Sequence, residues 1–147
     1  MDEPERRGWM AVLARADADA LAAALARLPD LPDWRVLRGP ESGLVMVRGR
    51  AGGGGAAFNL GEMTVTRCTV RMPGGEVGHA YVAGRDPRRA ELAAAVDALM
   101  QRPDLRGAVE RAVVQPLARA QQATREAIAA KAAATRVQFF TMATMRS

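Results

Sequence analysis

Two helices are predicted at the start of the chain from the spacing of its apolar residues. Residues 5–15 hold a cluster of large apolar side chains within two turns of a helix: Trp9, Met10, Val12 and Leu13. Residues 20–28 follow with leucines separated by four and then three positions, and Asp17 or Asp19 is a suitable N-cap for that helix. Pro29 then ends the helical pattern.

An extended pattern begins after Trp34 and predicts an antiparallel sheet. Segments of apolar and β-branched residues, separated by glycine or proline, lie at 34–38, 44–50, 57–60, 63–72 and 76–83. The last two segments are joined by Pro73-Gly74-Gly75, a turn sequence, so the final strand is expected to return antiparallel. We therefore predict four or five strands.

The longest of these segments, 63–72, alternates in a way that predicts one buried face. One set of alternating positions carries only apolar and small polar side chains: Thr64, Thr66, Cys68, Val70 and Met72. The other set includes Arg67 and Arg71, so we expect that face to look outward.

Helical patterns return in the second half of the chain. Asp86 and Pro87 have the residue types of an N-cap and a first helical position. Pro103 begins a shorter helix, and an alanine-rich helical region follows from Leu117. The predicted fold class is α+β: an antiparallel sheet flanked by N-terminal helices and a long C-terminal helical region, in a single domain over residues 1–147.

The C-terminal region, residues 117–147, carries most of its large apolar side chains at its far end. Ile128 is the only large apolar residue between Leu117 and Val137, and a helix of that composition buries little surface within its own domain. We therefore expect an arm that docks on another subunit through a few large side chains: Ile128, Phe139, Phe140 and Met142. A tail that folds back on the sheet is the alternative.

Arginine dominates the charge of the chain. The net charge is +5, and 20 of the 21 basic residues are arginine, with Lys131 as the exception. Arginine favours bidentate contacts with carboxylates and phosphates, so an acidic protein partner or a phosphorylated ligand fits at least as well as nucleic acid. Proteins that bind nucleic acid usually add lysine clusters or aromatic platforms, and aromatic residues make up only 4% here. A genome rich in G and C would also raise the arginine and alanine content.

A run of four glycines, Gly52 to Gly55, is a candidate anion-binding loop. It differs from a P-loop and from a dinucleotide-binding fingerprint, because the residues after it predict a strand and not a helix. A loop that exposes its backbone can still meet an anion or another subunit closely. The candidate residues for such contacts are Arg48, Arg50, Gly53, Gly54, Arg67 and Arg85. A plain hairpin loop on a solvated surface is the alternative.

The chain has too few reactive residues to predict a catalytic or metal site. Its one histidine, His79, has no recognisable nucleophile or orienting acid in the pattern around it, and we expect it in the core or in an interface. Its one cysteine, Cys68, excludes an internal disulfide and is expected to be buried. The acidic N-terminus and the lack of a long apolar run predict a cytoplasmic protein without a membrane-spanning helix.

Short strings spread in order along the chain suggest a family. They are Arg7-x-Trp9-Met10-x-Val12-Leu13-Ala14, Glu41-Ser42-Gly43-Leu44-Val45, Gly61-x-x-Thr64-x-Thr66-Arg67, Gly84-Arg85-Asp86 and Arg136-Val137-x-Phe139-Phe140-Thr141-Met142. No single string is diagnostic, but together they span residues 7–142. The set resembles the G subunit of the carbon–phosphorus (C–P) lyase system, the PhnG family.

That resemblance implies a subunit of a cytoplasmic complex that processes phosphonates, with the H, I and J subunits as core partners. With the H, I and L subunits, the G subunit is required to replace the adenine of MgATP with a phosphonate such as methylphosphonate, which forms α-D-ribose 1-methylphosphonate 5-triphosphate. The resemblance gives this chain no catalytic residue, metal or cofactor of its own, and MgATP is a substrate of the complex. It implies an accessory or scaffolding role. We expect the isolated chain to self-associate through the surface that its partners normally cover.

Overall fold

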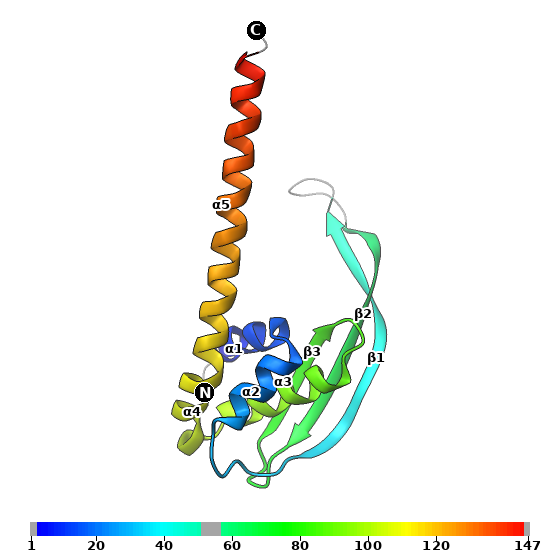
Figure 1. The fold of residues 1–147 in the computed structure, drawn as a ribbon. Coiled ribbons are helices and arrows are strands. Elements are labelled where there is room, and N and C mark those ends of the chain that lie inside the picture. The colour runs from blue at the N-terminus through cyan, green and yellow to red at the C-terminus, as the bar shows by residue number, and fades with distance from the viewer. Residues whose placement is uncertain (1–2, 51–56, 146–147) are drawn as a thin grey trace.

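The structure of the protein is a computed structural model that describes residues 3–50 and 57–145. Its elements are α1 (Glu3–Arg15), α2 (Ala18–Ala26), β1 (Arg35–Arg50), β2 (Ala57–Arg71), β3 (Val77–Ala83), α3 (Pro87–Met100), α4 (Pro103–Val109), a π-helical turn η1 (Glu110–Val114) and α5 (Gln115–Met145). Figure 1 shows a body of helices and sheet from which α5 and the far end of the β1–β2 hairpin project. The α+β class, the N-terminal helices and the long C-terminal helix are confirmed.

The described residues form a sheet of three antiparallel strands in the order β1–β2–β3. The prediction of four or five strands is therefore wrong for this part of the chain. The error comes from two pairs of segments that each form one continuous strand: 34–38 with 44–50 in β1, and 57–60 with 63–72 in β2.

Strand β1 continues through its glycine and proline because it bulges instead of turning. Its pairing with β2 shifts register between Val36 and Arg38 and again between Arg38 and Glu41. Gly39, inside this irregular stretch, has a φ of 79°, and a Cβ atom there would lie 2.6 Å from the carbonyl oxygen of Arg67. Glycine is thus needed both for the backbone conformation and for the close approach of β2.

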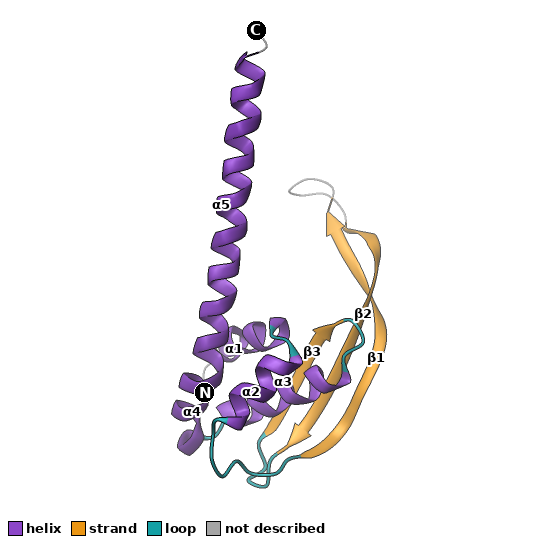
Figure 2. Cartoon of the chain, viewed as in Figure 1, coloured by secondary structure: helices purple, strands orange, loops and turns teal. Residues whose placement is uncertain are grey.

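Helix α3 packs against one face of the sheet, and Figure 2 shows the helices gathered on that side. The alternation predicted for β2 is confirmed, since Thr66, Cys68 and Val70 are buried while Arg67 and Arg71 are exposed. Two hydrogen bonds confirm Asp17 as the N-cap of α2 and Asp86 as the N-cap of α3. The carboxylate of Asp17 accepts from the backbone nitrogen of Ala20, and that of Asp86 accepts from the backbone nitrogen of Arg89.

Small side chains let α3 approach the sheet closely. Five of its alanines are buried: Ala90, Ala93, Ala94, Ala95 and Ala98. A Cβ atom added to Gly78 of β3 would lie 2.7 Å from the backbone nitrogen of Ala98 and 2.9 Å from the Cβ atom of Ala98. Atoms do not pack that closely, so β3 requires a glycine at the point where α3 crosses it.

The carboxylate of Asp97 joins α1, α3 and β3 inside the core. Its side chain is fully buried and accepts four hydrogen bonds. Oδ1 accepts from Nε of Arg6 at 3.3 Å and from Nε1 of Trp9 at 2.8 Å, while Oδ2 accepts from Nη2 of Arg6 at 2.9 Å and from the backbone nitrogen of His79 at 2.9 Å. The hydrogen bond to Asp97 raises the pKa of Arg6, so this guanidinium remains charged and balances the buried carboxylate.

Side chains of α1 and α3 also satisfy backbone groups on the edge of β3. Besides the bond from His79 to Asp97, the carbonyl oxygen of Val77 accepts from Nε2 of Gln101 at 2.7 Å, and that of Ala83 accepts from Nη2 of Arg89 at 3.0 Å. This edge is therefore closed to a further strand at these positions.

Helix α5 leaves the body soon after it begins. Leu117 packs against the core, and Nε2 of Gln121 donates to the carbonyl oxygen of Val12 at 2.9 Å. Every side chain from residue 122 to residue 144 is exposed. The helix projects away from the body in Figure 1 and does not fold back on the sheet. No helix in the described part of the chain is long and apolar enough to cross a membrane.

Replacing Gly78 with alanine is expected to destabilise the protein, because the added methyl group forces α3 away from β3. Overpacking of this kind lowers the free energy of unfolding by about 1–3 kcal/mol. Gly8→Ala is the matched control, since Gly8 lies in α1 with open space at its Cβ position and alanine should add roughly 0.4–1 kcal/mol. Denaturant unfolding measures both; a Gly78→Ala protein as stable as the Gly8→Ala protein would contradict the close packing.

Replacing Asp97 with alanine is expected to lower the free energy of unfolding by roughly 3–5 kcal/mol, because it leaves Arg6 without its partner in a partly buried site. Asp104→Ala is the control: Asp104 is exposed, pairs only with Arg102 among the described contacts, and should change stability by less than about 1 kcal/mol. Thermal and denaturant unfolding compare the two. Equal stability losses would show that the Asp97 cluster is not special.

Candidate functional site

Two of the candidate anion-binding residues, Arg48 and Arg67, lie far apart in the structure. Arg48 lies opposite Asn59 near the far end of the hairpin, whereas Arg67 lies eight positions farther along β2. At 3.3 Å per residue, about 26 Å of strand separates these two positions, so they cannot hold one phosphate together. Gly53 and Gly54 lie outside the described residues, and so does the side chain of Arg50.

Arg85 is held in a turn that a buried hydroxyl organises. Oγ1 of Thr66 donates to the carbonyl oxygen of Gly84 at 2.6 Å and accepts from the backbone nitrogen of Asp86 at 3.0 Å. A further hydrogen bond of 2.9 Å joins Thr66 to Oγ of Ser42 on β1. The turn between β3 and α3 is thus fixed, with Arg85 exposed on it.

Arg67 lies on the open face of the sheet and already has a carboxylate partner. Oε1 of Glu41 accepts from Nε of Arg67 at 2.6 Å and from Nε of Arg38 at 3.1 Å. The hydrogen bond from Arg67 lowers the pKa of Glu41, and the same bond raises the pKa of Arg67. The stabilisation from this pair is therefore present at neutral pH and is lost as the pH falls through the lowered pKa of Glu41; solvent exposure keeps it small.

Two small hollows flank Arg67 and Tyr81 on this open face. One, of about 190 Å³, is bounded by the β1 residues 41–45, and the other, of about 180 Å³, by Arg38, Thr69 and His79. Each is smaller than the roughly 300–1,000 Å³ that encloses a small-molecule ligand. His79 is exposed here, with Nδ1 at 3.2 Å from Oγ1 of Thr69, so it is not a core residue.

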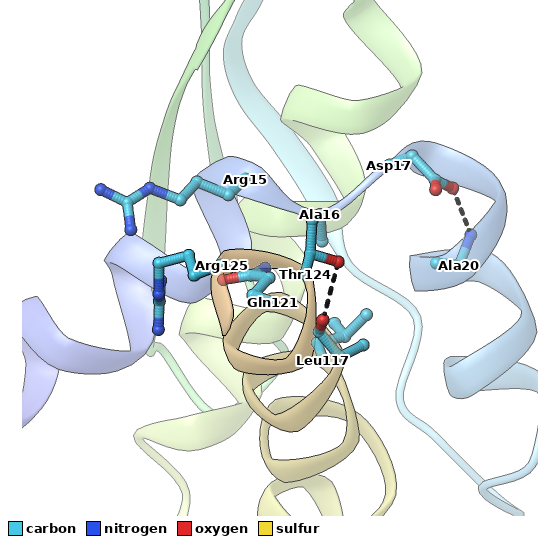
Figure 3. Close-up of a pocket in the computed structure, with 9 residues that line it drawn as sticks. Arg15, Ala16, Asp17, Ala20, Leu117, Gln121, Thr124 and Arg125 are labelled. Carbon is cyan, nitrogen blue, oxygen red and sulfur yellow. Dashed lines mark hydrogen bonds between the residues drawn. The ribbon is translucent and has the colours of Figure 1, made fainter. Parts of the chain in front are cut away.

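A larger hollow lies where α5 meets the α1–α2 junction. It has a volume of about 570 Å³. Its lining is formed by two segments far apart in sequence: Arg15, Ala16, Asp17, Ala20, Leu117, Ala120, Gln121, Thr124 and Arg125. Figure 3 shows the side chains of Arg15 and Arg125 together on one side, while the carboxylate of Asp17 caps α2 by accepting from Ala20.

This hollow is suited to holding an apolar group with a neighbouring negative charge. Most of its lining is alanine, leucine and the stems of longer side chains, with Arg15 and Arg125 as its basic groups. Its one carboxylate, Asp17, already accepts a hydrogen bond from the backbone of Ala20 as the N-cap of α2, and its one hydroxyl, on Thr124, donates to the carbonyl oxygen of Ala120. The chemistry of the hollow is therefore that of a docking surface.

The sequence analysis missed two features of the structure, the hollow and the Asp97 cluster. The hollow is lined by two segments about 100 positions apart, and neither segment carries a sequence pattern that predicts it. Asp97 had one signal, since it is the only charged residue in the apolar run from Leu92 to Met100. Its four hydrogen bonds come from the protein itself, so its role is structural.

The remaining reactive groups of the described chain are inert or dispersed. Cys68 is buried as expected, and burial raises the pKa of its thiol, which keeps it protonated. Among the described residues, no three histidine, cysteine, aspartate or glutamate side chains lie close enough together to hold a metal ion.

Comparison with known proteins identifies the family. The family model for the phosphonate metabolism protein PhnG matches residues 4–145. A curated relative from Rhizobium meliloti (strain 1021) is 51% identical over 138 residues, which cover 94% of this chain and 88% of the relative. That relative is named alpha-D-ribose 1-methylphosphonate 5-triphosphate synthase subunit PhnG. The resemblance seen in the sequence is confirmed, and the chain belongs to the PhnG family of phosphonate metabolism proteins.

Proposed function

We propose that this protein is a subunit of the phosphonate C–P lyase complex and acts in the α-D-ribose 1-methylphosphonate 5-triphosphate synthase. In that role it is required, with the H, I and L subunits, to transfer ribose triphosphate from ATP to methylphosphonate. The observation that carries this proposal is the match to the synthase subunit over 94% of the chain. MgATP and the phosphonate are substrates of the complex, and we place the complex in the cytoplasm with H, I and J as the core partners.

The proposed role of this chain is to scaffold the complex. The candidate arginines Arg48 and Arg67 are too far apart to share a site, and Arg67 is already paired with Glu41. The buried carboxylate of Asp97 is fully used in holding the fold. By contrast, the chain exposes a long helix whose side chains have no cover of their own from residue 122 to 144. A surface of this kind is typical of a subunit that is completed by its neighbours.

A catalytic contribution across an interface is the second candidate function. The observation that favours it is the open face of the sheet, where Arg35 and Arg71 stand opposite each other and Arg38 and Arg67 share Glu41. The one carboxylate of Glu41 balances one of these four guanidinium charges and leaves three positive charges unbalanced. Such a face can stabilise the negative charge of a triphosphate held by a neighbouring subunit.

The two candidate functions predict different effects of arginine variants in the reconstituted complex. For a scaffold, Arg48→Ala, Arg67→Ala and Arg85→Ala should each leave turnover within about threefold of the wild type, while omission of the chain abolishes it. A group that stabilises developing charge would instead cost about 100–1,000-fold in turnover. Synthase assays with native mass measurement separate the two. Loss of turnover in an intact complex would overturn the scaffold role.

The isolated chain is predicted to self-associate through the apolar end of α5. Val137, Phe139 and Phe140 are between 65% and 75% exposed, which is unfavourable in water. Removing residues 137–147 should therefore convert the isolated protein to a monomer. Sedimentation velocity over a range of concentrations measures this, and a truncated protein that dimerises as strongly as the full chain would contradict the prediction. Arg27→Ala, on an exposed position outside α5, is the control for unspecific effects.

A further inference from the structure

Two parts of the molecule extend beyond the body and expose apolar side chains. We call α5 beyond Gln121 the helical arm, and the paired residues 44–50 and 57–63 of the hairpin the strand arm. The large apolar side chains of the helical arm are 60–75% exposed: Ile128, Val137, Phe139, Phe140 and Met142. Those of the strand arm are 37–64% exposed: Leu44, Val45, Met46, Val47 and Met63.

Neither arm is expected to be stable without cover. From residue 122 to 144 the helical arm is about 35 Å long at 1.5 Å per residue, and a helix with no packed face is marginal in water. A ribbon of two strands is marginal for the same reason, because it cannot bury an apolar face on its own. Both arms therefore require a partner surface.

The apolar face of the strand arm continues the core side of the sheet. Leu44 stands opposite Thr64 in the register, and Met46 is two positions farther along β1, so both share the face of Thr64 and Thr66. Helix α3 covers that face around Thr66, which is buried. In the strand arm the same face is uncovered, and Leu44 and Met46 are exposed there.

The apolar stripe of the helical arm also continues a surface that faces the body. Ile128 and Phe139 follow Leu117 at steps of eleven residues, which is close to three helical turns, so the three lie on nearly one side of α5. Leu117 packs against the core and lines the 570 Å³ hollow at the base of the arm. The stripe thus rises from that hollow on the side of α5 that looks toward the body.

The two arms project from the same side of the body. In Figure 1 they rise from the same side of the body, and each is a continuous extension of an element anchored in it. The β1–β2 ladder joins the strand arm to the sheet, and the bond between Gln121 and Val12 fastens the base of the helical arm to α1. A partner that contacts the apolar faces of both arms would meet Leu44 and Met46 on one and Ile128 and Phe139 on the other.

Charge favours an acidic partner over a second copy of this chain. α5 carries four basic residues, Arg119, Arg125, Lys131 and Arg136, against the single acid Glu126. Arg15 adds a further guanidinium at the hollow. A second copy has the same net charge of +5, so pairing two copies would set like charges together. Carboxylates around an apolar strip on another subunit would complement these groups.

We propose that the helical arm and the strand arm clasp one acidic subunit of the synthase complex, with Leu44 and Met46 on one side of it and Ile128 and Phe139 on the other. This inference rests on the proposed function, which supplies the complex. Two contacts on one partner raise the local concentration of the second contact once the first has formed. Loss of either arm should therefore weaken the hold on the same subunit.

The test uses the core complex, made by co-expressing this chain with the H, I and J subunits. Leu44→Thr/Met46→Thr removes the apolar face of the strand arm and keeps a residue that favours strands. Ile128→Gln/Phe139→Gln removes the stripe of the helical arm and keeps a residue that favours helices. The matched controls change the opposite faces of the same arms: Val45→Thr/Val47→Thr on the strand, and Val137→Gln on the helix. Circular dichroism verifies that each variant folds.

The expected result is that both arm variants release the same subunit on dilution, with an apparent Kd at least tenfold higher, while the controls stay within about threefold. Higher salt should weaken that same contact. The clasp is overturned if the two arm variants release different subunits, if the controls weaken binding equally, or if cross-linking in the complex joins the arms of two copies of this chain. A wild-type chain that assembles with none of the subunits would overturn the proposed function itself, and the clasp with it.

Discussion

The fold depends on one buried carboxylate. Asp97 lies in an alanine-rich helix that could otherwise slide against the sheet, because small side chains interlock weakly. Its four hydrogen bonds fix α3 to the guanidinium of Arg6, the indole of Trp9 and the backbone of β3 at His79. A buried ion pair contributes little net stability when its desolvation is counted, but it penalises every arrangement in which the pair is separated. Here it selects one position of α1 and α3 on the sheet.

Local chemistry allowed the helix starts to be predicted but not the number of strands. Asp17 and Asp86 act on residues three positions away, so their capping role is visible in the sequence. The stretch around Gly39 has the composition of a turn, but the ladder with β2 holds it in the sheet as a bulge. Turn and bulge share the same local preferences, and only the distant partner strand distinguishes them.

The sequence allowed one prediction about the site, which is that the chain has too few reactive residues for catalysis. A chain with one histidine and one cysteine offers little for catalysis. The separation of two candidate arginines, Arg48 and Arg67, by about 26 Å of strand became visible only with the pairing of β1 and β2. Asp97 accepts hydrogen bonds from Arg6 and Trp9, which are 91 and 88 positions away in the sequence. The hollow at the base of α5 also joins the two ends of the chain. Such features arise from tertiary packing, which the local pattern does not encode.

The position of α5 after the body in the sequence has a consequence for assembly. Synthesis proceeds from the N-terminus, so every buried residue of the body, up to Val114, is made before the exposed part of α5. The most apolar stretch of the helix, around Phe139 and Phe140, is made after all of these buried residues. The apolar stretch of α5 therefore emerges only after the whole body has been synthesised. This order limits the time in which a bare apolar helix could meet unfinished chains.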